Sequence, residues 1–119
     1  MGETSMKHIS SKRAKALAIS EETKEQVWCR DAGRCVWCRL HPEYWTGYKA
    51  YPEAHLIPRP KGGLGIPENV LTLCRPHHDE LDHSMRSHRA EMRQELIGYL
   101  KHYYPDWEQE KVIYHKEGL

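Results

Sequence analysis

The sequence contains no phenylalanine, and it has no long apolar run. Four Trp and seven Tyr supply the large rings in 119 residues, and 39% of the residues are hydrophobic. No segment approaches the ~20 apolar residues of a membrane-spanning helix, and the start MGETSMKHISSKR has no apolar core of the kind found in signal peptides. We therefore expect one domain with a modest core, in the cytoplasm and with no membrane partner.

A strong charge of one sign is also lacking, because the formal net charge is +1. Global charge therefore does not indicate a nucleic-acid-binding protein. Two segments are nevertheless locally basic. Residues 1–20 carry a net charge of +3, and the stretch 57–78 carries Arg59, Lys61 and Arg75 against Glu68. Such a local surplus suits a phosphate-containing partner, although random clustering on a solvated surface would give the same counts.

The cysteines follow a metal-binding pattern rather than a disulfide pattern. Cys35 and Cys38 form a Cys-x-x-Cys knuckle, and 35 residues separate it from a second knuckle of equal spacing, Cys74-x-x-His77. Two such knuckles supply the four tetrahedral ligands of a structural zinc site. His78 competes with His77 for the fourth position, and the spacing favours His77. A redox role for Cys-x-x-Cys is the alternative, but no βαβ pattern surrounds it.

The pattern of elements predicts an α+β fold. Ser20 is a candidate N-cap for a helix to about Asp31. Pro and Gly residues separate two strand-like runs that would pair as a hairpin. The expected elements are strands at 51–57 and 70–73, helices at 75–84 and from Ser87 to about 103, and a short final helix capped by Asp106. The expected division is a basic N-terminal arm at 1–19, floppy or partly ordered, and a domain at 20–119, with its core at about 27–84 and C-terminal helices at 87–114, whose end packs back on the core.

Several residues carry more than one interpretation. Val27 and Trp28 are expected to face the core, and Cys29 is expected to be a small buried hydrophobe. Tyr44, Trp45 and Tyr48 have the ring chemistry to stack on nucleic-acid bases. We expect these three rings to cover the small core instead.

A second group of polar residues surrounds the zinc ligands. His55 lies in the apolar run Ala54-His55-Leu56-Ile57. If His77 binds zinc, His78 is free and points about 100° away on the same helix. Asp82 lies at i+4 from His78 and shares its helix face. His78 and Asp82 are therefore a reasonable pair for a second, open metal site, with Asp79, Glu80 and His83 as near alternatives.

These residues resemble the HNH endonuclease family, which has a ββα-metal (His-Me finger) fold. The name-giving positions match His55, Asn69 and His78. The surrounding stretches HLIPRPKGG and PENVLTLC match the family too, and the Cys pair at the end of VWCRDAGRCVWC is similar to that of the zinc-braced members. The tail YLKHYYPDWEQEKVIYHK resembles small HNH proteins of bacteriophages and prophages. The resemblance covers about 27–82 well and the rest loosely.

The resemblance implies a role for each residue. His55 would be the general base that activates water, and Asn69 would brace the loop that orients it. His78 would bind a catalytic divalent ion (Mg²⁺, Mn²⁺, Ni²⁺ or Zn²⁺) at the scissile phosphate. Arg59, Lys61 and Arg75 would contact neighbouring phosphates of DNA. The expected products carry a 5′-phosphate and a 3′-hydroxyl.

One position departs from the family. The residue before the base is often a metal ligand, and here it is Ala54. Asp82, His83 or Glu53 could replace that ligand, or water or the phosphate could fill the position. The leading interpretation is a metal-dependent DNA endonuclease that nicks or cuts both strands. The alternative is a non-catalytic zinc module that binds nucleic acid or protein, such as a phage packaging or recombination component.

Overall fold

A two-stranded antiparallel hairpin forms the centre of the computed structural model, which describes residues 11–116. Strand β1 (Ala50–His55) pairs with β2 (Val70–Cys74), in the register Ala50↔Cys74 and His55↔Val70. A bulge between Tyr51 and Ala54 interrupts the ladder. All five residues of β2 are buried, whereas β1 buries only its last two. The α+β class and the predicted strand pair are confirmed.

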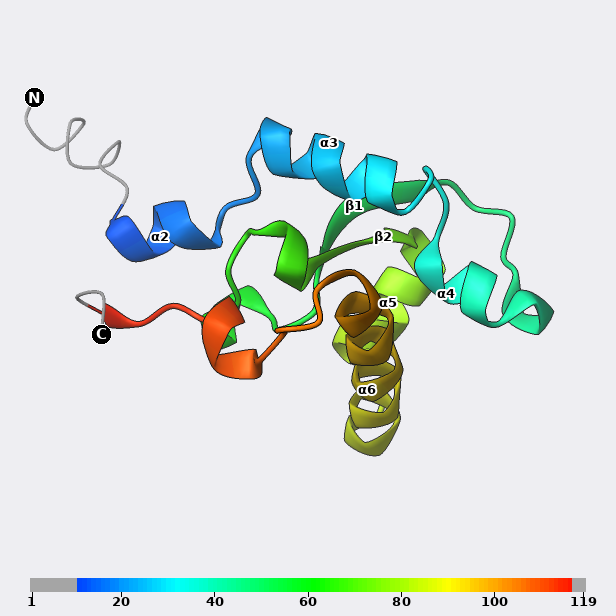
Figure 1. Cartoon of the computed structure of the whole chain (residues 1–119). Helices are drawn as coiled ribbons and strands as arrows, with labels where there is room; N and C mark the ends of the chain where they lie inside the picture. Colours follow the sequence, from blue (N-terminus) through cyan, green and yellow to red (C-terminus); the bar gives the residue numbers. More distant parts are fainter. Residues whose placement is uncertain (1–10, 117–119) are drawn as a thin grey trace, which may run out of the picture.

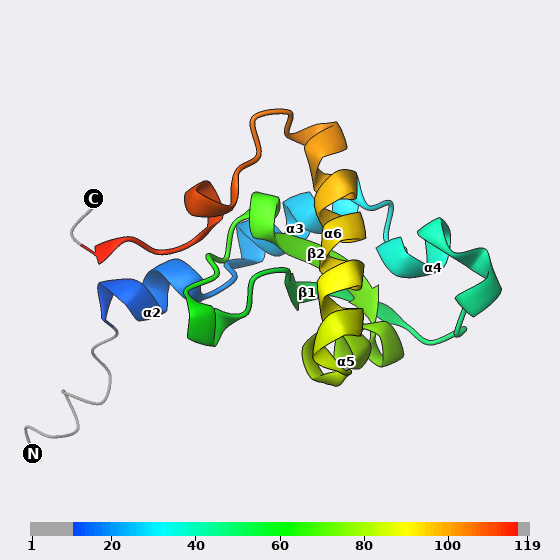
Figure 2. The ribbon, with the colours of Figure 1, turned by 90° about the horizontal axis from the view of Figure 1, so that it is seen from below.

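Helices lie on both sides of this hairpin. Figures 1 and 2 show α3 (Glu21–Arg30) on one side and α6 (Arg86–Tyr103) on the other, with α5 (Arg75–His83) continuing directly from β2. The short helix α4 (Val36–Leu40) lies near the C-terminal end of β2. Residues 11–116 also contain four single-turn 3₁₀ segments: η1 (Pro42–Tyr44), η2 (Arg59–Lys61), η3 (Pro67–Asn69) and η4 (Gln109–Val112).

Helix α6 packs through the apolar residues that its sequence spacing predicts. Met92, Leu96, Ile97 and Leu100 are all buried in the same cluster as the strand residues. Two predicted caps are wrong. The N-cap of α6 is Met85 rather than Ser87, and the last turn is a 3₁₀ segment after Glu108 rather than a helix capped by Asp106. Apolar packing therefore determines these segments more than capping side chains do.

Helix α3 begins as predicted but presents less of its surface to the core. The Ser20 hydroxyl accepts a hydrogen bond of 3.0 Å from the Thr23 amide, and Val27 is fully buried. The predictions for Trp28 and Cys29 are wrong, because both side chains are exposed. A helix turns by about 100° per residue, so only Val27 of these three faces the hairpin.

The aromatic residues between α4 and β1 also differ from expectation. Tyr44, Trp45 and Tyr48 are 59%, 72% and 66% exposed, so they do not cover the core. Trp37 and Trp107 are the rings that enter the main apolar cluster. The knuckle and the chain end, rather than the aromatic loop, therefore supply the large core rings.

A buried ion pair joins the layers. Arg30 binds the Asp31 carboxylate with two hydrogen bonds, of 2.7 and 2.9 Å, and its guanidinium also donates to the Pro67 and Val70 carbonyls. Asp31, which is fully buried, accepts from the Thr72 amide at 2.9 Å and from the Tyr99 hydroxyl at 2.6 Å. Burial alone would lower the pKa of Arg30, but the hydrogen bonds to Asp31, the charge of Asp31 and the contact with Tyr104 together outweigh burial, and the pKa is raised.

Both ends of the described chain pack on the loop between the strands. The short helix α2 (Lys12–Leu17) follows the N-cap Ser11 and buries Leu17. It falls in the stretch assigned to the N-terminal arm, of which residues 1–10 lie outside the described part. At the other end, the Tyr114 amide donates to Gly62, and Gly63 pairs with Ile113. Figures 1 and 2 place α2 and this C-terminal segment at the same end of the molecule.

Gly65 brings α2 against the loop. Its amide donates to the Ala16 carbonyl at 2.9 Å, and a Cβ at this position would lie only 2.0 Å from the Ala18 carbonyl oxygen. Only glycine permits this backbone approach. None of the described helices combines the length and apolar character needed to cross a membrane.

Candidate functional site

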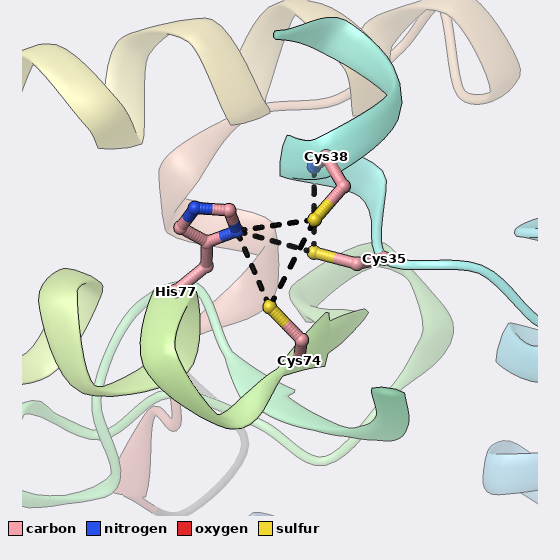
Figure 3. Close-up of side chains that lie close together, drawn as sticks. All are labelled: Cys35, Cys38, Cys74 and His77. Atoms are coloured by element: carbon pink, nitrogen blue, oxygen red, sulfur yellow. Dashed lines mark hydrogen bonds between the residues drawn. The ribbon is translucent and has the colours of Figure 1, made fainter. Parts of the chain in front are cut away.

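Three cysteines and one histidine converge where α4 meets the start of α5 (Figure 3). Cys35 and Cys38 come from the knuckle at α4, Cys74 ends β2, and His77 lies in the first turn of α5. The Nδ1 atom of His77 lies 3.6, 3.5 and 3.3 Å from the sulfurs of Cys35, Cys38 and Cys74. All four donor atoms lie within 4.8 Å of one another.

These distances fit one tetrahedral metal ion. Zn–S bonds of ~2.3 Å and Zn–N bonds of ~2.0–2.1 Å place tetrahedral donor atoms about 3.8 Å (S···S) and about 3.6 Å (S···N) apart. The Cys38 and Cys74 sulfurs are 3.9 Å apart, close to the first value. The predicted Cys₃His cluster is therefore present and could hold a structural metal such as zinc. His77, not His78, completes it.

Neighbouring groups support thiolate ligands at this cluster. The Thr46 hydroxyl donates to the Cys74 sulfur at 3.1 Å, and the Cys38 amide donates to the Cys35 sulfur at 3.4 Å. Without a metal, burial raises the pKa of Cys35 to about 12 and lowers the pKa of His77. Without a metal, the Cys35 thiol would therefore be protonated and the His77 imidazole neutral, and metal binding would release the proton of Cys35.

A cavity of about 710 Å³ lies on the other side of α5. Its polar lining includes His55, His78, Asp82, His83, Arg59 and Lys24. His77 and His78 are adjacent in sequence but face different sites, because neighbouring helix residues point about 100° apart. The start of α5 thus separates the Cys₃His cluster from this cavity.

His55 is fixed by a contact from outside the hairpin. Its Nε2 donates a hydrogen bond of 2.8 Å to the backbone carbonyl of Leu17. A carbonyl oxygen only accepts, so Nε2 carries the proton of the neutral ring and Nδ1 keeps its lone pair. Burial is the main cause that lowers the pKa of His55 from its ordinary value, with Arg59 adding to the effect. The imidazole is therefore held in its basic form at neutral pH.

His78 and Asp82 form the expected pair on one face of α5. The His78 Nε2 atom lies 3.3 Å from the Asp82 Oδ2 atom. Both side chains remain partly exposed toward the cavity, so they could bind an ion together with solvent or substrate. Within residues 11–116, the Cys₃His cluster is the only group of three or more potential ligands that converges. The His78–Asp82 pair thus offers two protein donors.

The position before His55 faces away from the cavity. Ala54 is fully buried in the apolar cluster. Of the three side chains considered as replacements, Asp82 contacts His78, whereas Glu53 lies 3.6 Å from the Lys24 ammonium. His83 lines the cavity. The geometry therefore places Asp82 nearest to a shared site with His78.

Asn69 is fully buried and does not line the cavity. Its Oδ1 accepts from the Ile57 amide at 2.9 Å, and its Nδ2 donates to the carbonyls of Ile57 and Leu64 at 3.2 and 2.9 Å. Gly63 makes room for this side chain, since a Cβ there would lie 2.8 Å from Nδ2. Asn69 is therefore a positioning residue that ties together the loop after His55.

The three basic residues expected to contact phosphates lie in different places. Arg59 lines the cavity. Lys61 is exposed on η2 outside it, and Arg75 lines a separate hollow with Tyr48, Lys49, Tyr51 and Glu53. The structure thus brings only Arg59 to the His55 site.

Sequence reasoning missed Leu17, Lys24 and the Arg30–Asp31 pair. Leu17 acts through its backbone carbonyl, which any residue type supplies, so its identity carries no signal. Lys24 lines the cavity from α3. The glycine at position 65 was the available clue that another backbone segment approaches this loop.

Comparisons with protein-family models, with curated proteins and with solved structures found no match.

Proposed function

We propose that this chain is a metal-dependent HNH endonuclease with a ββα-metal core, which hydrolyses phosphodiester bonds of DNA. The order of its parts supports this assignment: a hairpin carrying His55, a loop tied by Asn69, and a following helix carrying His78 and Asp82. The proposal includes a cytoplasmic location, and it includes zinc as the metal of the Cys₃His cluster, which holds α4 and α5 together.

The observation that carries the proposal is the setting of His55. A buried imidazole with a lowered pKa and an unprotonated Nδ1 is a general base available at neutral pH. It lines the same cavity as a His–Asp pair and an arginine. A histidine that only packs in a core would not require a free Nδ1, a cavity beside it and a neighbouring His–Asp pair.

The residues would divide the reaction as follows. His55 would accept the proton of the attacking water through Nδ1, while the Leu17 carbonyl holds Nε2–H. His78 and Asp82 would hold a divalent ion, Mg²⁺, Mn²⁺, Ni²⁺ or Zn²⁺, which when bound supplies charge stabilisation at the scissile phosphate and the leaving 3′ oxygen. Arg59 would contact a phosphate beside the cleaved bond. The products would carry a 5′-phosphate and a 3′-hydroxyl.

One observation favours a second candidate function. Within residues 11–116, only two protein donors meet at the proposed catalytic ion, because the side chain of Ala54 has no donor atom. A non-catalytic zinc module that binds nucleic acid or a protein of a phage packaging or recombination system would not need a third donor. DNA binding that persists without cleavage would support this second function.

A plasmid-nicking assay separates the two. Zinc-loaded protein is incubated with supercoiled plasmid and Mg²⁺, Mn²⁺ or Ni²⁺, and the wild type is compared with His55→Ala. A general base contributes typically ~10²–10⁴-fold in rate, and His55→Ala should lose about that much. The matched control is His102→Ala, an exposed histidine on α6 outside the cavity.

The endonuclease proposal fails if none of the three ions supports nicking by the folded wild type. It also fails if His55→Ala nicks at the wild-type rate. Circular dichroism and zinc content, measured on each variant, separate a lost base from a lost fold.

A further inference from the structure

A second hollow, distinct from the cavity at His55, lies beside the zinc knuckle. It measures about 900 Å³ and extends from α3 across the knuckle to the segment before β1. Its rings are Trp28, Trp45 and Tyr48, and its charged side chains are Arg34, Arg39 and Lys49. Cys35 and Cys38 of the zinc cluster also line it, and no Asp or Glu within residues 11–116 does. We call this hollow the aromatic groove.

The rings of the groove are exposed, and its two indoles pack on glycines. Trp45 and Tyr48 are 72% and 66% exposed, and Trp28 is 44% exposed. Two glycines in the left-handed region hold the indoles: a Cβ at Gly33 would lie 2.8 Å from Trp28, and a Cβ at Gly47 would lie 3.2 Å from Trp45. Each indole thus packs on glycine backbone while much of its surface faces solvent.

The groove also carries unpaired positive charge. Arg39 is engaged internally, because its guanidinium donates to the Asp31 carbonyl and the Tyr99 hydroxyl. Arg34 and Lys49 are exposed, and no carboxylate within residues 11–116 forms an ion pair with either. Exposed rings interleaved with free cations characterise surfaces that bind single-stranded nucleic acid.

A smaller hollow shares lining residues with both the groove and the cavity at His55. It is lined by Tyr48, Lys49, Tyr51, Glu53 and Arg75. Tyr48 and Lys49 also line the aromatic groove, and Glu53 also lines the cavity. Among the described residues that line the smaller hollow, Glu53 is the acidic one, and the Lys24 ammonium lies 3.6 Å from it. Tyr51 and Glu53 lie on β1, whose six residues span roughly 17–20 Å at ~3.3 Å per residue.

We propose that the aromatic groove binds single-stranded nucleic acid. The bases of the bound strand stack on Trp28, Trp45 and Tyr48, and the phosphates of that strand contact Arg34 and Lys49. Stacking uses ring faces that every base possesses, so the groove has little sequence preference. This binding does not depend on cleavage. We further infer that the bound strand continues along β1 to His55, and this step rests on the proposed function. DNA with an unpaired strand next to the cleaved bond would then be the preferred substrate.

Charge selects this occupant over a peptide or a second copy of the chain. Apart from the zinc ligands Cys35 and Cys38, the charged groups that line the groove are the three cations Arg34, Arg39 and Lys49, and they share the groove with three exposed rings. A polyanion with flat bases satisfies both features at once. An apolar peptide segment would leave Arg34 and Lys49 without partners.

Fluorescence anisotropy tests the groove directly. The probe is a fluorescein-labelled oligothymidylate, titrated with the zinc-loaded 119-residue chain and no other divalent ion. Trp45→Ala should weaken binding by about 5- to 150-fold, the equivalent of ~1–3 kcal/mol per stacked base. Trp45→Phe, which keeps a ring, should restore most of the affinity. Lys49→Gln should weaken binding and reduce the slope of log Kd against log salt by ~0.7.

Two variants outside the groove serve as matched controls. Tyr103→Ala removes an exposed ring and Lys101→Gln removes an exposed cation, both near the end of α6. Neither should change the affinity by more than twofold. The proposal is overturned if the wild type does not bind the oligonucleotide, or if Trp45→Ala binds it as tightly as Tyr103→Ala does. The wild type could instead self-associate without binding the oligonucleotide, and Trp45→Ala could abolish that self-association. This result would also overturn the proposal, because the occupant of the groove would then be a second copy of the chain.

Nicking and binding fail separately. Oligonucleotide binding without nicking under any ion would leave the groove in place and remove the nuclease. If the protein nicks plasmid but Trp45→Ala does not change the affinity for the oligonucleotide, the nuclease proposal stands and the groove proposal is wrong.

Discussion

The imidazole of His55 donates its Nε2 proton to the backbone carbonyl of Leu17, a residue 38 positions earlier in the chain. The proposed base is therefore oriented by α2, which belongs neither to the hairpin nor to the zinc cluster. The position of α2 depends in turn on the close contact between Gly65 and the backbone of Ala16 and Ala18.

Gly65→Ala should disable the site without touching His55. The added Cβ would lie 2.0 Å from the Ala18 carbonyl oxygen, so α2 must move away and His55 loses its acceptor. A misplacement of about 1 Å can cost ~10²-fold in rate, and we expect a loss of that order in plasmid nicking. Initial rates measured at saturating metal check this.

Gly98→Ala is the matched control. Nothing lies within 4 Å of a Cβ at that position on α6, and alanine favours a helix by ~1 kcal/mol over glycine. The control should nick normally and melt at a slightly higher temperature. Equal rates for both variants would show that α2 does not orient the base.

Cys74→Ser should remove the metal and destabilise the fold. Structural zinc contributes apparent binding energies of ~10–16 kcal/mol in small peptides, as much as the stability of a whole domain. Mass spectrometry of the native protein should find one zinc in the wild type and none in the variant, which should unfold at a much lower temperature. Cys29→Ser, at an exposed cysteine outside the cluster, should retain both. A zinc-free wild type that unfolds cooperatively would contradict the assignment of zinc.

Asp82→Ala should raise the metal concentration needed for nicking. Asp82 is the carboxylate beside His78, whereas Glu53 lies beside Lys24. We expect the half-maximal Mn²⁺ concentration to rise by about tenfold or more for Asp82→Ala, in line with the ~10–100-fold that metal-site partners are worth. Glu53→Gln should leave it nearly unchanged. The reverse order would move the second ligand from α5 to β1.

Asp31→Asn should cost about 3–5 kcal/mol of unfolding free energy, the typical effect of breaking a buried ion pair from one side. The change leaves the Arg30 guanidinium, whose side chain is 7% exposed, without its counter-charge. Urea denaturation measures the loss. Glu21→Gln, which affects an exposed pair with Lys24, should change stability by less than ~1 kcal/mol. A loss no larger than that of Glu21→Gln would rule out a structural role for the Arg30–Asp31 pair.

The contact between His41 and Glu95 should make stability depend on pH. A hydrogen bond of 2.6 Å to Glu95 raises the pKa of His41 above its ordinary value. A raised folded-state pKa adds stability that is fully present below about pH 6.5 and is lost as the pH rises through the folded pKa. Glu95→Gln should therefore be less stable than the wild type at pH 5.5–6 and converge with it at higher pH. Histidine NMR titration and urea unfolding check this. Glu91→Gln, an exposed neighbour on α6, should follow the wild type throughout.

Local patterns predicted most of the frame. The equal spacing of Cys35-x-x-Cys38 and Cys74-x-x-His77 anticipated the cluster, and the helical period anticipated the buried face of α6. The i+4 relation anticipated the His78–Asp82 pair. What failed depended on distant partners. The rings of Trp45 and Tyr48 are hydrophobic enough for a core, but Trp37 and Trp107 occupy the core instead. Nothing local to Arg30 shows that β2 and α6 will surround Asp31.

The contact between Gly65 and α2 has a consequence for synthesis. Translation delivers α2 long before Gly65, the residue on which it docks, so α2 cannot take its final place until the loop has left the ribosome and folded. A nascent chain therefore has no oriented histidine at His55. In a nuclease of the proposed kind, full cleavage activity would therefore appear only after this loop has folded against α2.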